Sequence, residues 1–346
     1  MDSLDNTRER RKDEHIKYFL SVDDMGSNGF EDVVLQNNSL PDVDFDEITT
    51  EYVFLEKYID SPLMINAMTG GTEYTGDICR KLARLAVRFN IPIAVGSQTI
   101  AFDNPKAAET FRMVREINKD GIVIANLSAN MDIDSVYKAI DMIEADAVQL
   151  HLNVAQEMCM AEGDRCFKGA LDNIRAIADL SGVPVIVKET GFGMSFETAV
   201  KLYDAGIRYI DISGRGGTNF VSIESQRNLE RDCSFMKNWG IPTAQSLLEC
   251  RKASSDLFLI CSGGISKPEE IIKALCMDAD MAALGGALLR ILVERDYEAA
   301  EKYLEKLIYE IRVLMLLLGA MEVTELKNVP YLLKGELREL YSYKFR

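Results

Sequence analysis

The chain has 346 residues, of which 47% are hydrophobic, and its formal net charge is −16. The isoelectric point of about 4.7 argues against a nucleic acid or an anionic membrane surface as a partner, because both require a basic surface. The longest apolar run, residues 313–318, is far too short to span a bilayer, and the polar, acidic start does not resemble a signal peptide. The seven cysteines include no Cys-x-x-Cys pair. We therefore expect a cytoplasmic protein with reduced, mostly buried thiols.

Short apolar segments rich in β-branched residues alternate with amphipathic helical patterns along the chain. Eight of them predict buried strands at Leu63–Met68, Ile91–Val95, Ile122–Asn126, Ala147–Leu152, Pro184–Lys188, Tyr209–Ser213, Leu257–Cys261 and Met281–Leu284. The helical patterns include Gly76–Phe89, Phe196–Asp204, Pro268–Cys276 and a last outer helix at Glu301–Gly319. This alternation predicts an α/β fold, a parallel (β/α)₈ TIM barrel, with a doubly wound sheet as the alternative. The lack of Gly-x-Gly-x-x-Gly after the first strand counts against that alternative.

Two segments fall outside the repeat, although no stretch has the composition of a disordered linker. We therefore treat residues 1–346 as one domain with an N-terminal extension at residues 1–60. This extension carries the one concentrated basic cluster, Arg8, Arg10, Arg11 and Lys12. The cluster is either a solvated helix face paired with nearby acidic residues or an anion clamp. The connection between Gly214 and Asp256 is longer than the others, which is typical of a lid or a binding loop.

The fourth predicted strand ends in the densest group of polar side chains. It holds one of the two histidines, His151, followed by Asn153, Gln156 and Glu157. A helix N-terminus capped by Asn153 would explain any one of these residues. Together, at the end of a barrel strand, they indicate a catalytic site with hydrogen-bonding groups, a candidate proton donor and a metal ligand.

Glycine-rich loops follow several other predicted strands, among them Gly263-Gly264 and Gly285-Gly286 after the seventh and eighth. These two loops often bind phosphate in barrels, because glycine leaves backbone N–H groups free to face an oxyanion. They indicate a phosphate-bearing cofactor, with tight turn geometry as the alternative. Lys188, at the end of the fifth strand, is compatible with a Schiff base, with contact to a flavin ring, or with simple pairing to Glu189.

In their order and spacing, these motifs resemble the type 2, flavin-dependent isopentenyl diphosphate isomerases. The most specific pieces are Ala67–Gly71, Gly96–Gln98, Gln149–Asn153 with Gln156 and Glu157, Glu162–Arg165, Val187–Glu189, Gly214–Thr218 and Ser262–Ile265. One departure is the loop Gln98–Ile100, because some members carry arginine directly after Gly-Ser-x. If that arginine binds diphosphate, this chain depends more on Arg11, Lys12 and a cation.

The resemblance implies a barrel that binds FMN. By matching motifs, the flavin and its phosphate would contact Ala67, Met68, Thr69, Ser97, Asn126, Lys188, Ser213, Thr218, Gly263, Gly264, Gly286 and Ala287. The substrate diphosphate would be bound by Arg11, Lys12, His151, Asn153 and Gln156, with Mg²⁺ on Glu157. The resemblance also suggests that Arg11 and Lys12 reach into a neighbouring subunit of a homo-oligomer, a tetramer or an octamer.

The reaction implied by the resemblance converts isopentenyl diphosphate into dimethylallyl diphosphate, with FMN reduced by NADPH. Protonating the alkene develops a tertiary carbocation, which an electron-rich reduced flavin can stabilise. His151 and Gln156 are the expected catalytic side chains, with Gln156 orienting or relaying while the flavin transfers the proton. The rivals are another FMN-dependent barrel, such as an α-hydroxy acid oxidase, and a non-catalytic flavin- or phosphate-binding subunit. The lack of a third histidine opposes the first, and the intact Gln156-Glu157 pair opposes the second.

Overall fold

The structure is a computed structural model that describes residues 2–22, 26–228 and 232–345. Within these residues, eight parallel strands close into a barrel in the order β10-β11-β4-β5-β6-β7-β8-β9. The predicted TIM barrel is confirmed, and the doubly wound alternative is wrong. The barrel strands are β4 Leu63–Ile65, β5 Ile93–Ala94, β6 Val123–Ser128, β7 Ala147–Leu152, β8 Val185–Glu189, β9 Tyr209–Asp211, β10 Phe258–Cys261 and β11 Met281–Leu284.

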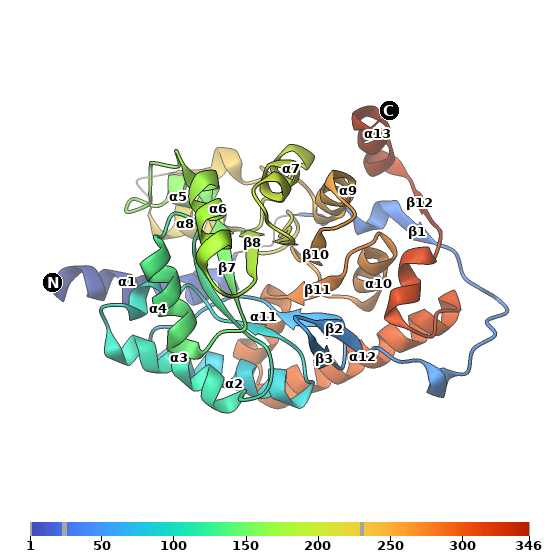
Figure 1. Ribbon diagram of the computed structural model, residues 1–346, viewed down its shortest axis with the longest axis horizontal. Helices are drawn as coiled ribbons and strands as arrows, with labels where there is room; N and C mark the ends of the chain where they lie inside the picture. The colour runs from blue at the N-terminus through green and yellow to red at the C-terminus, as the bar shows by residue number, and fades with distance from the viewer. Residues whose placement is uncertain (1, 23–25, 229–231, 346) are drawn as a thin grey trace.

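Helices surround the barrel on its outside, while α1 extends to one side of it at the N-terminal end of the chain (Figure 1). The helices are α1 Asp2–Ser21, α2 Glu73–Arg88, α3 Pro105–Ile117, α4 Ile133–Ile143, α5 Val154–Cys159, α6 Ala170–Leu180, α7 Phe196–Asp204, α8 Phe220–Arg227, α9 Thr243–Ala253, α10 Pro268–Cys276, α11 Gly286–Glu294, α12 Tyr297–Leu318 and α13 Gly335–Lys344.

Two of these helices begin earlier than predicted: α2 at Glu73 rather than Gly76, and α12 at Tyr297 rather than Glu301. Helix α12 begins there because the Asp296 side chain caps it by accepting a hydrogen bond from the Ala299 N–H at 2.7 Å. It is not the last helix, since α13 follows and packs near α9. The amphipathic pattern locates the apolar face of a helix well, but it does not register the polar first turn that a cap makes stable.

Three barrel strands end earlier than predicted at the mouth of the barrel: β5 by one residue, at Ala94, and β4 and β9 by more. Strand β4 ends at Ile65, after which the Asn66 side chain accepts a hydrogen bond from the Ala67 N–H at 2.8 Å. Strand β9 ends at Asp211, and Ser213 adopts a left-handed backbone conformation with φ of 33°. In β4 and β9 a polar side chain binds the local backbone and turns the chain into the loop.

The interior of the barrel is apolar at one end and polar at the other. Its apolar layer includes Met64, Ile124, Ala147, Ile186 and Ile260. Side chains alternate along a strand, so the residue two positions further on also points inward. Those positions are polar and lie at the carboxyl ends of the strands: Asn66, Asn126, Gln149, Lys188 and Ser262.

The N-terminal extension contacts the barrel at several places. Strands β2 Tyr52–Phe54 and β3 Lys57–Ile59 form a hairpin whose Phe54 and Ile59 pack on the apolar interior layer and close that end of the barrel. Strand β1 Val33–Leu35 pairs antiparallel with β12 Tyr331–Leu333, which joins the extension to the C-terminal segment. Among the described residues no helix is long and apolar enough to cross a membrane. All seven cysteines are free thiols, and all but Cys166 are buried, as predicted.

Candidate active site

A cavity of about 440 Å³ lies at the polar mouth of the barrel. This volume falls in the range of about 300–1,000 Å³ that is typical of cofactor pockets. The predicted cofactor residues that line it are Ala67, Met68, Lys188, Ser213, Thr218, Gly263, Gly264, Gly286 and Ala287. Three others, Thr69, Ser97 and Asn126, lie at the neighbouring strand ends but do not line the cavity.

One end of the cavity is built to receive an anion. The first residues of α11, Gly286 and Ala287, line it together with Gly263, Gly264 and Thr218, so a helix N-terminus, two further glycines and a hydroxyl-bearing residue lie there. A Cβ atom at Gly286 would lie 3.1 Å from the Thr218 Oγ1 and would narrow this space. The lining therefore fits the phosphate of a flavin nucleotide.

The two glycine loops differ in why they need glycine. Gly263 and Gly264 both have positive φ, of 107° and 73°, and a Cβ atom on either would collide with the backbone carbonyl of Gly214 or Gly216. Turn geometry thus accounts for this pair, whereas Gly286 has only side chains close to where its Cβ would lie. The sequence alone did not separate these two explanations.

Helix α1 forms one wall of the same cavity, through His15, Ile16 and Phe19. Arg290 of α11 holds the end of α1 in place by donating to the carbonyl oxygens of Leu20 at 3.2 Å and Phe19 at 3.3 Å. The extension therefore lies over the mouth of its own barrel. In this single chain Lys12 lies against the end of β5 of its own barrel, and the reach of Arg11 and Lys12 into a neighbouring subunit stays a prediction.

Two of the predicted cations lie at the mouth. Lys12 donates to the Ser97 carbonyl oxygen at 3.1 Å, and burial, together with the charge of Arg11, lowers the pKa of Lys12 to about 8. Burial also lowers the pKa of Arg11, whose guanidinium lies 3.8 Å from Glu162. Arg10 points elsewhere and pairs with Glu14, and the side chain of Arg8 lies outside the described part of the chain. Of the N-terminal basic cluster, Arg11 and Lys12 are thus the members that face the loops at the carboxyl ends of the strands.

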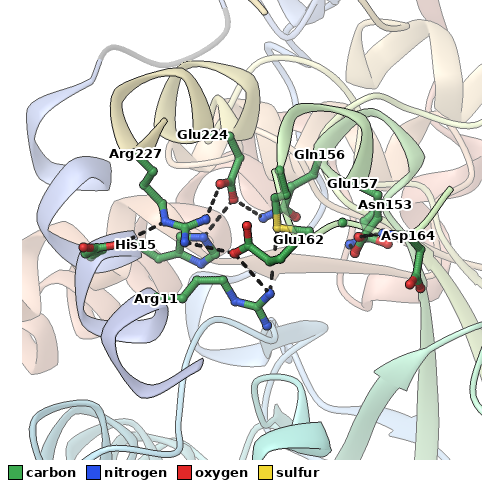
Figure 2. Close-up of polar contacts among 12 residues, drawn as sticks. Arg11, His15, Asn153, Gln156, Glu157, Glu162, Asp164, Glu224 and Arg227 are labelled. Carbon is green, nitrogen blue, oxygen red and sulfur yellow. Dashed lines mark hydrogen bonds and ion pairs between the residues drawn. The ribbon is translucent and has the colours of Figure 1, made fainter. Parts of the chain in front are cut away.

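A buried carboxylate, Glu224, connects three elements at the mouth (Figure 2). His15 of α1 and the Gln156 amide of α5 each lie 2.9 Å from the Glu224 Oε1, and Arg227 pairs with its Oε2. Burial alone would raise the pKa of Glu224, but these hydrogen bonds and the Arg227 charge lower it to about 2. Burial lowers the pKa of His15, so at neutral pH a neutral His15 donates to an ionised Glu224.

Gln156 and Glu157 are adjacent in sequence, but their side chains have different partners (Figure 2). The Glu157 carboxylate accepts hydrogen bonds from the Asn153 amide and from the Asp164 N–H, each at 2.7 Å. Burial raises the pKa of Glu157, and these two hydrogen bonds lower it in part. Asn153 is the N-cap residue of α5 by position, but its side chain holds Glu157 rather than the helix N-terminus. The predicted N-cap position of Asn153 is confirmed, but its side chain makes no capping hydrogen bond.

His151 is the residue before the last of strand β7 and is a neutral imidazole. Burial, reinforced by the charges of Lys12, Lys188 and Arg11, lowers the pKa of His151 to about 3. Its Nδ1 lies 3.0 Å from the Asn126 Oδ1. Lys188 lies beside it in register on β8, where it donates to the Glu189 backbone oxygen at 2.7 Å and pairs with Asp211 at 3.5 Å. The acidic partner of Lys188 is thus Asp211 and not the Glu189 carboxylate.

The loop that departs from the family pattern has a structural role. Gln98 is fully buried, donates to the Ala139 carbonyl at 3.0 Å and accepts from the Asn126 N–H at 3.0 Å. The Thr99 hydroxyl, at the position where some members carry arginine, lies 3.3 Å from the Ser97 hydroxyl. Neither side chain supplies a positive charge to the mouth.

Three acidic or basic residues of the site were not predicted from the sequence: Glu224, Arg227 and Asp211. Glu224 and Arg227 belong to the long connection predicted to be a lid or binding loop, and their spacing of three residues places them on one face of α8. Asp211 is fully buried at the end of β9. An acidic residue two positions before a barrel loop, in an apolar strand, was the available signal.

Comparison with known proteins agrees with this geometry. A family model described as FMN-dependent dehydrogenase matches residues 124–331. The isopentenyl-diphosphate delta-isomerase of a Geobacillus species is 43% identical over 331 residues, covering 95% of each chain. The chain belongs to the type 2, FMN-dependent isopentenyl-diphosphate delta-isomerase family. Isomerases of the same name from Bacillus licheniformis and Listeria innocua are 41% and 39% identical and cover 95% and 98% of this chain, and 95% and 96% of their own.

Solved structures similar to this isomerase are more distant in sequence. A mandelate oxidase is 17% identical with a TM-score of 0.66, covering 93% of this chain and 94% of its own. A lactate oxidase from Pediococcus acidilactici is 16% identical with a TM-score of 0.71, covering 92% and 87%. At this identity the likeness establishes a shared barrel and nothing about the substrate.

Proposed function

We propose that this isomerase converts isopentenyl diphosphate into dimethylallyl diphosphate, using reduced FMN in the cavity and Mg²⁺ at Glu157. The observation that carries the proposal is the position of α1. Its residues His15, Ile16 and Phe19 line the cavity. Arg11 and Lys12 do not line it but lie about one turn earlier on the same helix, where Lys12 contacts the Ser97 carbonyl oxygen and Arg11 lies near Glu162. An acidic protein thereby presents two cations where a diphosphate would have to bind.

The diphosphate would be bound at the mouth by Arg11 and Lys12, beside His151. Lys12 is already held toward the strand ends by Ser97, so it loses little side-chain freedom when the anion binds. Arg11 would exchange its long contact with Glu162 for a charge-assisted hydrogen bond to phosphate. Asn153 would act mainly through Glu157, to which its amide is bonded.

The residues present fit a Mg²⁺ ion that is shared with the substrate. Among the described residues, no group of three His, Cys, Asp or Glu side chains is placed to hold a metal alone. Glu157 offers one carboxylate, positioned by Asn153 and the Asp164 N–H, and each of its oxygens keeps a lone pair for a ligand. A cation there would complete its shell with phosphate oxygens and water, which is the usual arrangement for Mg²⁺.

The protein side chains position the alkene and do not themselves exchange protons with it. Bound reduced FMN supplies an electron-rich ring and a nitrogen, N5, that serves as acid or base. Gln156 has no titratable proton, and its amide is oriented by ionised Glu224, so it holds or relays a proton rather than originating one. His15, Ile16 and Phe19 cover the cavity and exclude water from the developing carbocation.

The remaining assignments belong to the same proposal. NADPH reduces the flavin, and the protein acts in the cytoplasm as a homo-oligomer whose subunits are single domains. An α-hydroxy acid oxidase stays the rival, and its need for a histidine after the sixth barrel strand is not met, since Ser213–Arg215 follow β9. His15, the second histidine, is bonded to Glu224.

The experiment that tests the proposal is an anaerobic isomerase assay of the purified protein. The protein is reconstituted with FMN, reduced with NADPH and supplied with Mg²⁺ and isopentenyl diphosphate. We expect flavin absorption bands, and dimethylallyl diphosphate that forms only after reduction. Peroxide released from a hydroxy acid, without isomerisation, would establish the rival instead.

A further inference from the structure

Buried polar side chains form a continuous chain across the barrel at the level of the cavity floor. From His151 Nδ1, contacts run to the Asn126 Oδ1 at 3.0 Å, and from the Asn126 Nδ2 to the Gln149 Oε1 at 3.1 Å. They continue from the Gln149 Nε2 to the Asn66 Oδ1 at 3.4 Å, and from the Asn66 Nδ2 to the Asp211 Oδ2 at 2.7 Å. The chain therefore joins β7 to β9 through three amides.

Asp211 is the last member of this series of hydrogen bonds, and its carboxylate accepts hydrogen bonds without donating any. Four donors converge on its carboxylate, which is fully buried. Besides Asn66, they are the Ser262 hydroxyl at 2.5 Å, the Ser213 N–H at 3.2 Å and the Lys188 ammonium at 3.5 Å. An ionised carboxylate has lone pairs for about four donors, whereas a protonated one would bring a donor of its own. Asp211 thus faces only donors and acts as the acceptor in all four contacts.

The orientation of each amide follows from this end of the chain. Because Asp211 accepts, Asn66 donates through its Nδ2 and presents its Oδ1 to Gln149, and the Ala67 N–H also bonds that Oδ1 at 2.8 Å. Gln149 then donates to Asn66 and accepts from Asn126. Because Asn126 donates to Gln149 through its Nδ2, the atom that it turns toward the imidazole is the acceptor Oδ1. The Nδ1 of a neutral His151 must therefore carry the proton.

We propose that Asp211 is a positioning residue that, through Asn66, Gln149 and Asn126, fixes His151 as the Nδ1–H tautomer. The proposal rests on the proposed function and adds a residue to it. Within the described part of the chain, Nε2 of His151 has no hydrogen-bond partner. Nε2 is therefore an acceptor at the mouth, beside Lys12 and Arg11. It takes up a proton when the diphosphate arrives and then donates to a phosphate oxygen, while Nδ1 keeps its bond and the ring keeps its position.

Nitrogen-15 NMR of the holoprotein, labelled on the histidine rings, tests this directly. The chain has only two histidines, so a His15→Gln sample assigns both rings. We expect His151 of the wild type to show a protonated Nδ1 and an unprotonated Nε2 at neutral pH. A protonated Nε2 with a bare Nδ1 would overturn the proposal, whatever the activity. Flavin content and isomerase rate are measured on the same samples, so a failure of the proposed function is seen separately.

Three variants test which residue anchors the chain. Gln149→Met cuts the chain at a residue that does not line the cavity, so we expect both tautomers of His151, unchanged flavin content and a kcat/KM lowered at least roughly tenfold. Asp211→Asn leaves four donors competing for one oxygen, so it too should give both tautomers. Asp280→Asn, which loses a comparable ion pair with Arg251 at the other end of the barrel, should leave His151 unchanged.

The outcomes distinguish the Asp211 carboxylate from the Ala67 N–H as the group that orients the Asn66 amide. If Gln149→Met changes the tautomer but a folded Asp211→Asn does not, the Ala67 N–H is the anchor and the role of Asp211 is overturned. If neither variant changes it, the amide chain does not set the tautomer. If Asp211→Asn does not fold, the wild-type spectrum and Gln149→Met decide whether the chain acts on His151, and Asp211→Glu, which keeps the charge, is expected to retain the wild-type spectrum.

Discussion

The imidazole of His15 and the carboxylate of Glu224 lie 2.9 Å apart and join the N-terminal helix to α8 across the mouth of the barrel. The same Glu224 oxygen also holds the amide of Gln156. The position of α1 and the orientation of a predicted catalytic side chain are therefore set by one carboxylate. Because Glu224 is buried and also pairs with Arg227, removing its charge affects all three partners.

Glu224→Gln should impair catalysis more than cofactor binding. Leaving buried charged partners unpaired costs about 2–5 kcal/mol, so kcat/KM should fall by at least roughly tenfold while flavin content per chain stays at the wild-type level. Flavin absorbance and initial rates measure the two effects. Glu294→Gln, which removes a half-exposed carboxylate paired with Arg290, is the control. Wild-type rates in Glu224→Gln would exclude a role for this contact.

Lys12 should give the reaction an alkaline limb near pH 8. Because burial and Arg11 lower the pKa of Lys12 to about 8, its ammonium loses its proton above that pH and diphosphate binding weakens. In the free enzyme, kcat/KM should then fall by about tenfold per pH unit above the pKa. Lys12→Arg should move the limb to higher pH, since a guanidinium stays charged. A limb that does not move would mean that another group titrates.

Glu157→Gln should weaken the response to Mg²⁺ and leave FMN binding intact. An amide oxygen is a poor substitute for a carboxylate toward a hard cation. The Mg²⁺ concentration for half-maximal rate should rise by more than the roughly 10- to 100-fold that loss of an outer-shell partner costs. Asp164→Asn is the matched control, because the Asp164 backbone N–H, and not its side chain, bonds Glu157. An unchanged Mg²⁺ response in Glu157→Gln would remove Glu157 from the metal site.

The two glycine loops should respond differently to valine. Gly286→Val meets only the Phe19 and Thr218 side chains, so the protein should fold but lose flavin, measured as absorbance per chain after dialysis. Gly263→Val should act on the fold instead, because a side chain there collides with the Gly214 backbone in a left-handed turn. Gly263→Val should lower the melting temperature, and a stable variant would contradict this account of the turn.

Mixing two inactive variants tests whether α1 serves its own barrel. The structure places Arg11 and Glu162 of one chain 3.8 Å apart, so Arg11→Ala and Glu157→Gln subunits should not restore activity to each other after subunit exchange. Native mass spectrometry confirms the exchange. Recovered activity would support the arm in trans that we inferred from the family resemblance.

The barrel was predictable because its signal is local. Apolar runs at regular spacing give the strands, and the polar residues that follow them give the carboxyl-end site. The hydrogen bond between Glu224 and Gln156 joins residues 68 positions apart, so nothing in either local pattern indicates the other. An acidic residue in an apolar strand marks Asp211 as unusual, but its partner Asn66 lies 145 positions away, so the local pattern does not indicate its role. Lys188 was placed correctly, but its partner was not, because neighbours across strands are set by register.

The hairpin formed by β2 and β3 closes the apolar end of the barrel, so the cavity communicates with solvent on the side where α1 lies. A ligand in the deeper part of the cavity must therefore enter before a ligand bound nearer to α1, and must leave after it. A diphosphate bound to Arg11 and Lys12 would then block the exit of the flavin behind it. The cofactor could then exchange only while no diphosphate is bound. A saturating concentration of the diphosphate product would slow the loss of the cofactor when the protein is diluted.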